Sequence, residues 1–185
     1  MTDTDILNQM IKDSARSIPR SDEYGNLCVE LCETRVNDSA VSIRHLPADA
    51  IVIKVDEFSS PDSVFKGEKG ECKRADYAII SEERKCIIYI EIKSTKDKWV
   101  DIVKQLKGAQ CFIGYCREIG KAFWNSEILK NYKPRFINIR HTCGSINKSE
   151  TRASIKDGKY DTPDKAWKMN WQKDIQFNHL AGLGR

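Results

Sequence analysis

The chain has 185 residues, of which 40% are hydrophobic and 31% are charged, with a formal net charge of +4. This composition is ordinary for a globular protein, and this length is typical of one domain with its own core. No apolar run approaches the roughly 20 residues that a membrane-spanning helix needs. The first residues, MTDTDILNQM, carry acids where a signal peptide carries basic residues. We therefore expect a cytoplasmic protein without a membrane segment.

Charge is distributed unevenly along the chain. Residues 1–65 carry 6 basic and 12 acidic side chains, whereas residues 117–185 carry 14 basic and 7 acidic ones. A basic C-terminal third suits a polyanionic partner, although a solvated lysine-rich surface explains the charge equally well. The seven cysteines show no zinc-finger spacing, and their odd number argues against a complete disulfide framework.

The N-terminal part is predicted to begin with a helix. Apolar residues recur at helical spacing over 4–16, with Thr4 or Asp5 as the cap. The segment 26–36 fits a strand and a helix equally well. Two strands are then expected, followed by a long polar loop: these segments are 41–46, 50–55 and 59–73.

A predicted hairpin and a predicted helix follow. Strands are expected over 74–80 and 86–93, and the five residues between them are too few for a crossover, so the strands are antiparallel. The second strand contains CIIYIEI, which is apolar on both faces and therefore typical of a strand in a sheet with helices packed on it. From 97 to 117 apolar residues recur every three or four positions, as in an amphipathic helix that covers a sheet.

The order of elements predicts an α/β fold. Gly114 is a candidate interruption of the long helix and Gly120 its expected end, before a short helix over 121–132 and a strand over 136–139. The result is the order αβββαβ, with a mixed sheet of four to five strands flanked by helices. We expect one domain over 1–185, with a core at about 4–141 and an extension, 142–185, that packs on it. Thr162, Pro163 and Asp164 could start a short helix with Trp167, and four apolar residues should return to the core: Trp171, Ile175, Phe177 and Leu180.

Two acids and a lysine share one face of the predicted hairpin. Side chains alternate along a strand, so Glu91 and Lys93 lie on the same face. If Ile80 pairs with Ile87, Asp76 lies directly opposite Glu91, with the Cβ atoms about 4.5–5.5 Å apart. Opposed carboxylates repel one another, and a hard cation such as Mg²⁺, which prefers oxygen ligands, removes that repulsion.

The predicted chemistry is hydrolysis of a phosphodiester with a divalent cation. Asp76 and Glu91 would hold Mg²⁺, with Mn²⁺ as a substitute. Ile92 should send its side chain into the core and offer its backbone carbonyl as a further ligand. Lys93 would position a water molecule or stabilise charge on the phosphate. Four lysines are candidate phosphate contacts, although a solvated helix face is an equal alternative: Lys96, Lys98, Lys104 and Lys107.

Asp76, the hairpin, the triplet Glu91–Ile92–Lys93 and the amphipathic helix together resemble the PD-(D/E)XK nuclease superfamily, which includes restriction endonucleases and Holliday-junction resolvases. The resemblance implies a restriction-endonuclease-like core and a magnesium-dependent nuclease. It maps the metal-binding acids to Asp76 and Glu91 and the catalytic lysine to Lys93. In some branches a glutamine on the following helix takes part, and both Gln105 and Gln110 are candidates.

The sequence departs from the family pattern at two points. Ala75 precedes Asp76, so the Pro-Asp pair is absent there, and the pair Pro61-Asp62 lies in the long loop. Many members also carry a third acid upstream, for which this chain offers five candidates: Glu23, Glu30, Glu33, Glu57 and Glu71.

The resulting hypothesis is a metal-dependent nuclease that acts on nucleic acid, with DNA favoured over RNA. The alternative is a non-catalytic nucleic-acid-binding or protein-binding module of the same fold, acting as a subunit of a larger defence or repair complex. Cleavage of both strands would favour a homodimer, because one such site cuts one strand at a time.

Overall fold

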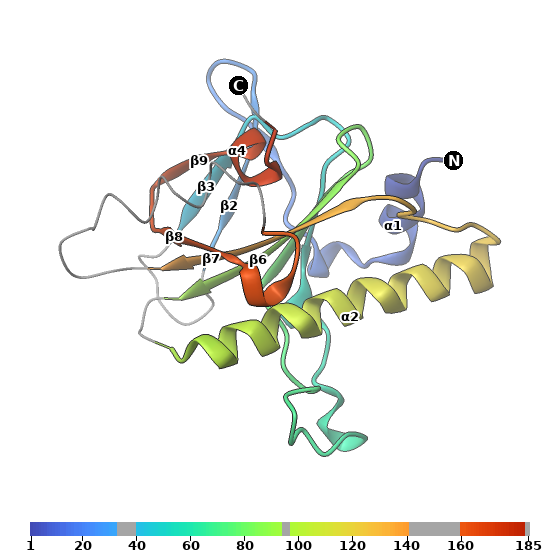
Figure 1. Ribbon diagram of the computed structural model, residues 1–185. Helices are drawn as coiled ribbons and strands as arrows, with labels where there is room; N and C mark the ends of the chain where they lie inside the picture. Colours follow the sequence, from blue (N-terminus) through green and yellow to red (C-terminus); the bar gives the residue numbers. More distant parts are fainter. Residues whose placement is uncertain (33–39, 94–96, 141–159, 184–185) are drawn as a thin grey trace.

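The computed structural model describes residues 1–32, 40–93, 97–140 and 160–183. Two mixed β-sheets and the helices around them form the α/β architecture that the order of elements predicted (Figure 1). In the described part of the chain, no helix combines the length and the apolar character needed to cross a membrane.

The larger sheet has five strands, and it contains the predicted hairpin and the predicted crossover. Strand β5 (Tyr77–Ser81) pairs antiparallel with β4 (Ile51–Lys54) on one side and with β6 (Cys86–Lys93) on the other. Strand β7 (Lys133–Arg140) runs parallel to β6, and β8 (Trp167–Asn170) runs parallel to β7. The helix α2 (Trp99–Trp124) connects β6 to β7, because parallel neighbours require a crossover. The strands follow one another in the sheet in the order β4, β5, β6, β7 and β8.

One face of this sheet is covered by helices. The long helix α2 (Trp99–Trp124) turns its buried stripe toward the sheet, and α1 (Asp3–Met10) adds Ile6 and Leu7 to the same core. Ile80, Ile87 and Tyr89 come from the strands beneath. Figure 1 shows α2 lying across the strands, with the loop between β4 and β5 projecting beyond the helix.

The opposite face is covered chiefly by a second sheet, so the expectation of helices on the sheet is correct for one face only. The order of the second sheet is β1 (Arg20–Ser21), β2 (Leu27–Leu31), β3 (Val41–Arg44) and β9 (Asp174–Gln176). Its buried residues, with those of the short helix α4 (Phe177–Ala181), join Ile88, Ile90 and Ile92 of β6 in one cluster. The segment 26–36, which fitted two readings, is therefore a strand over Leu27–Leu31.

Several helix boundaries differ from the predicted ones. The first helix ends at Met10, and its cap is Thr2, which forms a capping box with Asp5, so neither Thr4 nor Asp5 is the N-cap. A short 3₁₀ turn, Asp13–Ala15, follows. At its other end the first helix stops early because Ile11 is extended.

The helix α2 continues through Gly114 and Gly120 to Trp124 and ends at Asn125, which is left-handed. Gly120 does not end the helix but lies against Ile128, whose side chain would be 3.0 Å from a Cβ at this position. The short helix expected over 121–132 is accordingly wrong. Turns follow Trp124 instead.

The C-terminal residues are built into both sheets. After a 3₁₀ turn, Pro163–Lys165, Trp167 begins β8 rather than lying in a helix. Residues 160–183 thus supply β8 to one sheet and β9 to the other. Ile175, Phe177 and Leu180 are buried, as predicted, and Trp171 packs against the same cluster.

Two further 3₁₀ turns, Val55–Glu57 and Pro61–Ser63, lie between β4 and β5.

Candidate functional site

The observed register aligns Asp76 with Glu91. Ile80 pairs with Ile87, as predicted, and Tyr77 pairs with Ile90, which is the last pair before the two acids. Asp76 itself stands immediately before β5, where its carbonyl accepts a hydrogen bond from Val55 N at 2.8 Å. Because paired residues share a face, Asp76 and Glu91 both belong to the face of the sheet that α2 covers.

The carboxylate of Asp76 is held by the neighbouring strand. Its Oδ2 accepts a hydrogen bond from the backbone N–H of Ile92 at 2.7 Å. The side chain of Ile92 is fully buried in the opposite cluster, as strand alternation predicted. One strand therefore carries Glu91 and also orients Asp76. The role of the Ile92 carbonyl as a metal ligand stays a prediction.

Glu91 is a carboxylate with no exposed surface. Burial and the nearby negative charge of Asp76 raise its pKa, while Lys93 and the backbone N–H of Asp76 lower it, and the net result is a pKa of about 8. The Nζ atom of Lys93 lies 2.7 Å from Oε1 of Glu91. The Oε2 atom is buried without a hydrogen-bond partner among the described residues. A buried carboxylate oxygen in this state is costly unless a cation or a proton joins it.

Lys93 lies between two carboxylates. Besides Glu91, the Oδ2 atom of Asp97 is 3.6 Å from its Nζ. Burial by itself lowers the pKa of Lys93, but Glu91, Asp76 and Asp97 outweigh that effect and raise it above the ordinary value. Lys93 is therefore an ammonium at neutral pH, suited to stabilise anionic charge rather than to accept a proton.

These residues fit a hard divalent cation. Mg²⁺ keeps several of its water ligands in proteins and commonly uses only one or two carboxylates. Asp76 and Glu91 would supply those two, and Oε2 of Glu91 has no hydrogen-bond partner among the described residues. Within the described ranges, no cluster of three or more His, Cys, Asp or Glu side chains gathers as a ligand set.

None of the described candidates for a third acid joins such a set. Glu71 instead accepts hydrogen bonds within its own loop: its own backbone N–H lowers its pKa most, and the N–H groups of Lys69 and Gly67 lower it further. Glu33 lies outside the described residues. The remaining three are exposed and lie apart in the chain: Glu23 in the turn before β2, Glu30 on β2 and Glu57 after β4.

The two glutamines occupy different sides of α2. Five residues correspond to a rotation of about 140° around a helix. Gln105 lies between Asp101, whose carboxylate contacts Lys73 Nζ at 2.5 Å, and Gly108, which touches the Lys73 carbonyl. It is half-buried on the side of α2 along which the chain approaches Asp76, whereas Gln110 is exposed. The structure thus separates two candidates that the sequence left even.

The candidate phosphate contacts differ in setting. Lys98 is exposed at the start of α2, and Lys107 is exposed further along it. The stem of Lys104 packs under Gly70, so this side chain is partly used to support the loop. Lys96 lies outside the described residues.

Sequence reasoning missed a polar group on β7 and β8. Asn138 is fully buried, and its Nδ2 donates to the carbonyl of Glu91 at 3.2 Å. Its Oδ1 accepts from Arg140 Nε at 2.6 Å. Beyond it, Lys168 Nζ lies 4.2 Å from the ring centroid of Trp99. The available signal was the asparagine inside the apolar run FINI, since a buried amide needs specific partners.

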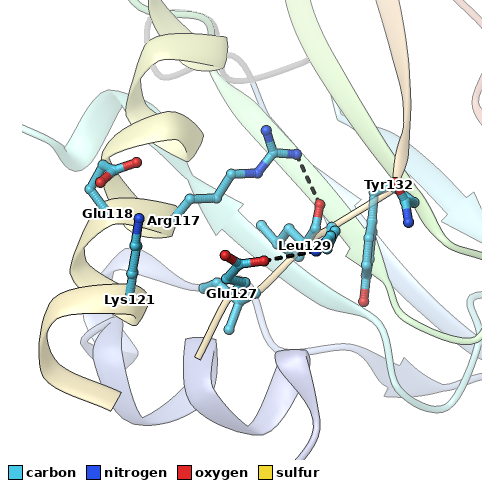
Figure 2. Close-up of a pocket in the computed structure, with 9 residues that line it drawn as sticks. Arg117, Glu118, Lys121, Glu127, Leu129 and Tyr132 are labelled. Carbon is cyan, nitrogen blue, oxygen red and sulfur yellow. Dashed lines mark hydrogen bonds and ion pairs between the residues drawn. The ribbon is translucent and has the colours of Figure 1, made fainter. Parts of the chain in front are cut away.

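A cavity of about 460 Å³ lies elsewhere, between the last turns of α2 and the segment 127–132 (Figure 2). Three of its charged groups contact neighbouring residues: Arg117 Nη2 donates to the Leu129 carbonyl at 3.1 Å, and Lys130 contacts Glu127 at 2.9 Å. The segment 127–132 leads into Lys133, which pairs with Cys86 at the start of β6, whereas Glu91 lies five positions further along that strand, on the order of 17 Å away. This cavity therefore lies at the opposite end of β6 from Asp76 and Glu91.

Comparison of the chain with protein-family models, with curated proteins and with solved structures gives no match.

Proposed function

We propose that this protein is a metal-dependent phosphodiesterase that cleaves nucleic acid, with DNA as the preferred substrate. The observation that carries the proposal is the buried carboxylate of Glu91, aligned with Asp76 and 2.7 Å from Lys93 Nζ. Burying Glu91 beside the half-buried Asp76 and Lys93 costs free energy, and such a cost is typically retained where the groups act on a ligand.

Each of the three residues has a distinct part in the proposed reaction. Asp76 and Glu91 would bind Mg²⁺ or Mn²⁺, which supplies a Lewis acid for the phosphate and lowers the pKa of a bound water molecule. Asp76 is oriented for this by the Ile92 N–H. Lys93 places a positive charge at the same edge of the sheet and stabilises the charge that grows on the phosphoryl oxygens.

The proposal extends to the family. Within the five-stranded sheet, the order β4, β5, β6, α2, β7 and the placement of Asp76, Glu91 and Lys93 support a restriction-endonuclease-like core of the PD-(D/E)XK type, with α1 and the strands β1, β2 and β3 of the second sheet preceding it in the chain. The inferred state is a cytoplasmic nuclease, acting as a homodimer where both strands are cut or as a subunit of a larger complex.

A non-catalytic binding module of the same fold is the second candidate. It is favoured by the fact that the described residues bring no third acid to Asp76 and Glu91. In that case Lys93 would serve as the permanent counter-ion of Glu91, and nucleic acid or protein would bind without being cut.

Metal binding and cleavage measured together separate the two candidates. Mn²⁺ binding to the protein is followed by electron paramagnetic resonance, and cleavage of plasmid and single-stranded DNA is followed with Mg²⁺ or Mn²⁺. We expect Asp76→Asn and Glu91→Gln to abolish both, whereas Glu118→Gln, an exposed position on α2, should change neither. Cleavage that persists in Glu91→Gln would place the chemistry elsewhere. Wild-type protein that binds DNA but never cuts it would identify the binding module.

A further inference from the structure

Polar side chains form two rows across the parallel strands, on the face that α2 covers. Glu91 pairs with Asn138, and Asn138 pairs with Lys168. One step further along the strands, Lys93 pairs with Arg140, and Arg140 pairs with Asn170. The face is apolar before this point, where Tyr89 stacks on Phe136 with the ring centroids 4.7 Å apart. Along these strands the side chains therefore change from aromatic to polar and charged, and this change marks the edge of the core.

Of the three cations in these rows, Arg140 and Lys168 are held in place by an amide and an indole ring, whereas Lys93 is paired with carboxylates. Arg140 donates through Nε to Asn138, which is fully buried and fastened in turn to Glu91 O. The Trp99 ring centroid lies 5.8 Å from Arg140 Cζ and 4.2 Å from Lys168 Nζ. Among the described residues, the ion pairs at this site involve Lys93 and do not extend to Arg140 or Lys168.

The form of this support suits a phosphate ligand. An Arg held through Nε presents the edge that carries its Nη atoms, and that edge forms paired hydrogen bonds with phosphate oxygens. An indole ring orients a cation but does not neutralise it, so the positive field persists. Lys168 is exposed, and Arg140 and Trp99 are half-buried, so a ligand can reach both cations.

The direction of the rows sets the direction of the ligand. Neighbouring strands lie about 4.8 Å apart, so Lys168, two strands from Glu91, lies on the order of 10 Å away from it across the sheet. A strand of B-form DNA rises about 3.4 Å per nucleotide, so this span corresponds to roughly three nucleotides. The cations thus extend away from Asp76 and Glu91 on one side.

We propose that Arg140 and Lys168, positioned by Asn138 and Trp99, bind phosphates on one side of the cleaved bond and lay the nucleic-acid strand across β7 and β8. This inference rests on the proposed function for the identity of its ligand. It adds a substrate class, because a chain of at least about three nucleotides is needed to reach Lys168. A mononucleotide diester reaches Lys93 alone.

Binding without metal tests the inference directly. Anisotropy of a fluorescein-labelled single-stranded DNA oligonucleotide is measured in EDTA over a series of salt concentrations. Each phosphate contact on a single strand contributes about 0.7 to the slope of log K against log salt, so Arg140→Gln with Lys168→Gln should lower that slope by about 1.4. Lys121→Gln is the matched control, since this exposed lysine lies 22 positions along α2 from Trp99, about 33 Å away. It should leave the slope unchanged.

Two variants of Trp99 test the positioning. Trp99→Phe keeps a ring beside the cations and should bind DNA within about twofold of wild type, whereas Trp99→Ala should weaken binding. Circular dichroism verifies that each variant is folded. Equal weakening in both variants would contradict a positioning role for the ring.

A small substrate separates this inference from the proposed chemistry. Cleavage of bis(p-nitrophenyl) phosphate with Mn²⁺ should depend on Glu91 but not on Arg140 or Lys168. If Arg140→Gln/Lys168→Gln loses DNA binding but the wild type shows no cleavage, the proposed reaction is contradicted and the inference is supported. Unchanged DNA affinity and salt slope in that double variant would overturn the inference, whether or not the small diester is cleaved.

Discussion

The ammonium of Lys93 lies 2.7 Å from Oε1 of Glu91, a carboxylate that has no exposed surface. Asp76, which is aligned with Glu91, places a second negative charge beside it. The positive charge of Lys93 partly offsets the repulsion between the two acids. The protonation states of the site therefore depend on the electrostatic interactions among Asp76, Glu91 and Lys93.

Replacement of Lys93 by Met should move the titration of Glu91 upward. Without the ammonium, desolvation and Asp76 act on Glu91 unopposed, so its pKa rises further above 8. We expect the midpoint of the pH dependence of Mn²⁺ binding to shift to higher pH and cleavage to fall about 10²-fold. Lys98→Met, the same change at the exposed start of α2, should leave the midpoint in place. An unshifted midpoint in Lys93→Met would refute the coupling.

Metal affinity should itself depend on pH. A cation must displace the proton that Glu91 retains up to a pKa of about 8. Apparent affinity for Mn²⁺ should therefore rise up to about tenfold per pH unit below 8 and level off above it. Titration calorimetry at three pH values, in two buffers of different ionisation enthalpy, measures the released proton. A flat profile would mean that Glu91 is not a ligand.

Glu91→Gln should stabilise the protein at alkaline pH while it removes activity. The folded-state pKa, about 8, lies above the unfolded value of about 4.3. The folded state therefore binds the proton more tightly, and this contribution to stability is complete below pH 4.3 and lost as the pH rises to 8. We expect the melting temperature of the wild type, relative to Glu91→Gln, to fall between pH 5 and 8 and then to level off. A constant difference between the two melting temperatures from pH 5 to pH 8 would contradict the raised pKa of Glu91.

Gly108 is expected to control the position of Asp76. A Cβ at this position would lie 1.7 Å from the carbonyl oxygen of Lys73, which is three residues before Asp76. The clash is with backbone, which cannot move aside as the end of a side chain can. Gly108→Ala should destabilise the fold by about 3 kcal/mol, at the upper end for overpacking, and weaken Mn²⁺ binding. In the same helix Gly114 has open space around it, so Gly114→Ala should stabilise the protein by up to about 1 kcal/mol. The free energy of unfolding is measured in urea. Similar changes of this free energy in Gly108→Ala and Gly114→Ala would contradict the close contact between Gly108 and the Lys73 carbonyl.

The two glutamines should differ in their effect on cleavage. Gln105 lies on the side of α2 that faces the approach to Asp76, whereas Gln110 is exposed on another side. Gln105→Ala should lower the rate of DNA cleavage, and Gln110→Ala should leave it within about twofold of wild type. The opposite ranking would assign the role to Gln110.

The hairpin and its face were predictable because they follow from local rules. Strand alternation places Glu91 and Lys93 together and Ile92 apart, and a short connection leaves only antiparallel pairing. The pairing of Ile80 with Ile87 is observed, and the same register, continued one residue past Tyr77 and Ile90, aligns the acids. Helix ends were less predictable, because Gly120 is accommodated by a tertiary contact with Ile128 rather than serving as a stop.

The sequence by itself determined the α/β class, the hairpin and the three charged residues on one face, since each depends on neighbours a few positions apart. Only the tertiary structure decided the second sheet, the burial of Glu91 and the attachment of Arg140 and Lys168 to Asn138 and Trp99. The physical reason is sequence separation. Asn138 is 47 positions from Glu91, and Lys168 is 69 positions from Trp99, so no local pattern encodes contacts that arise when distant strands align in parallel.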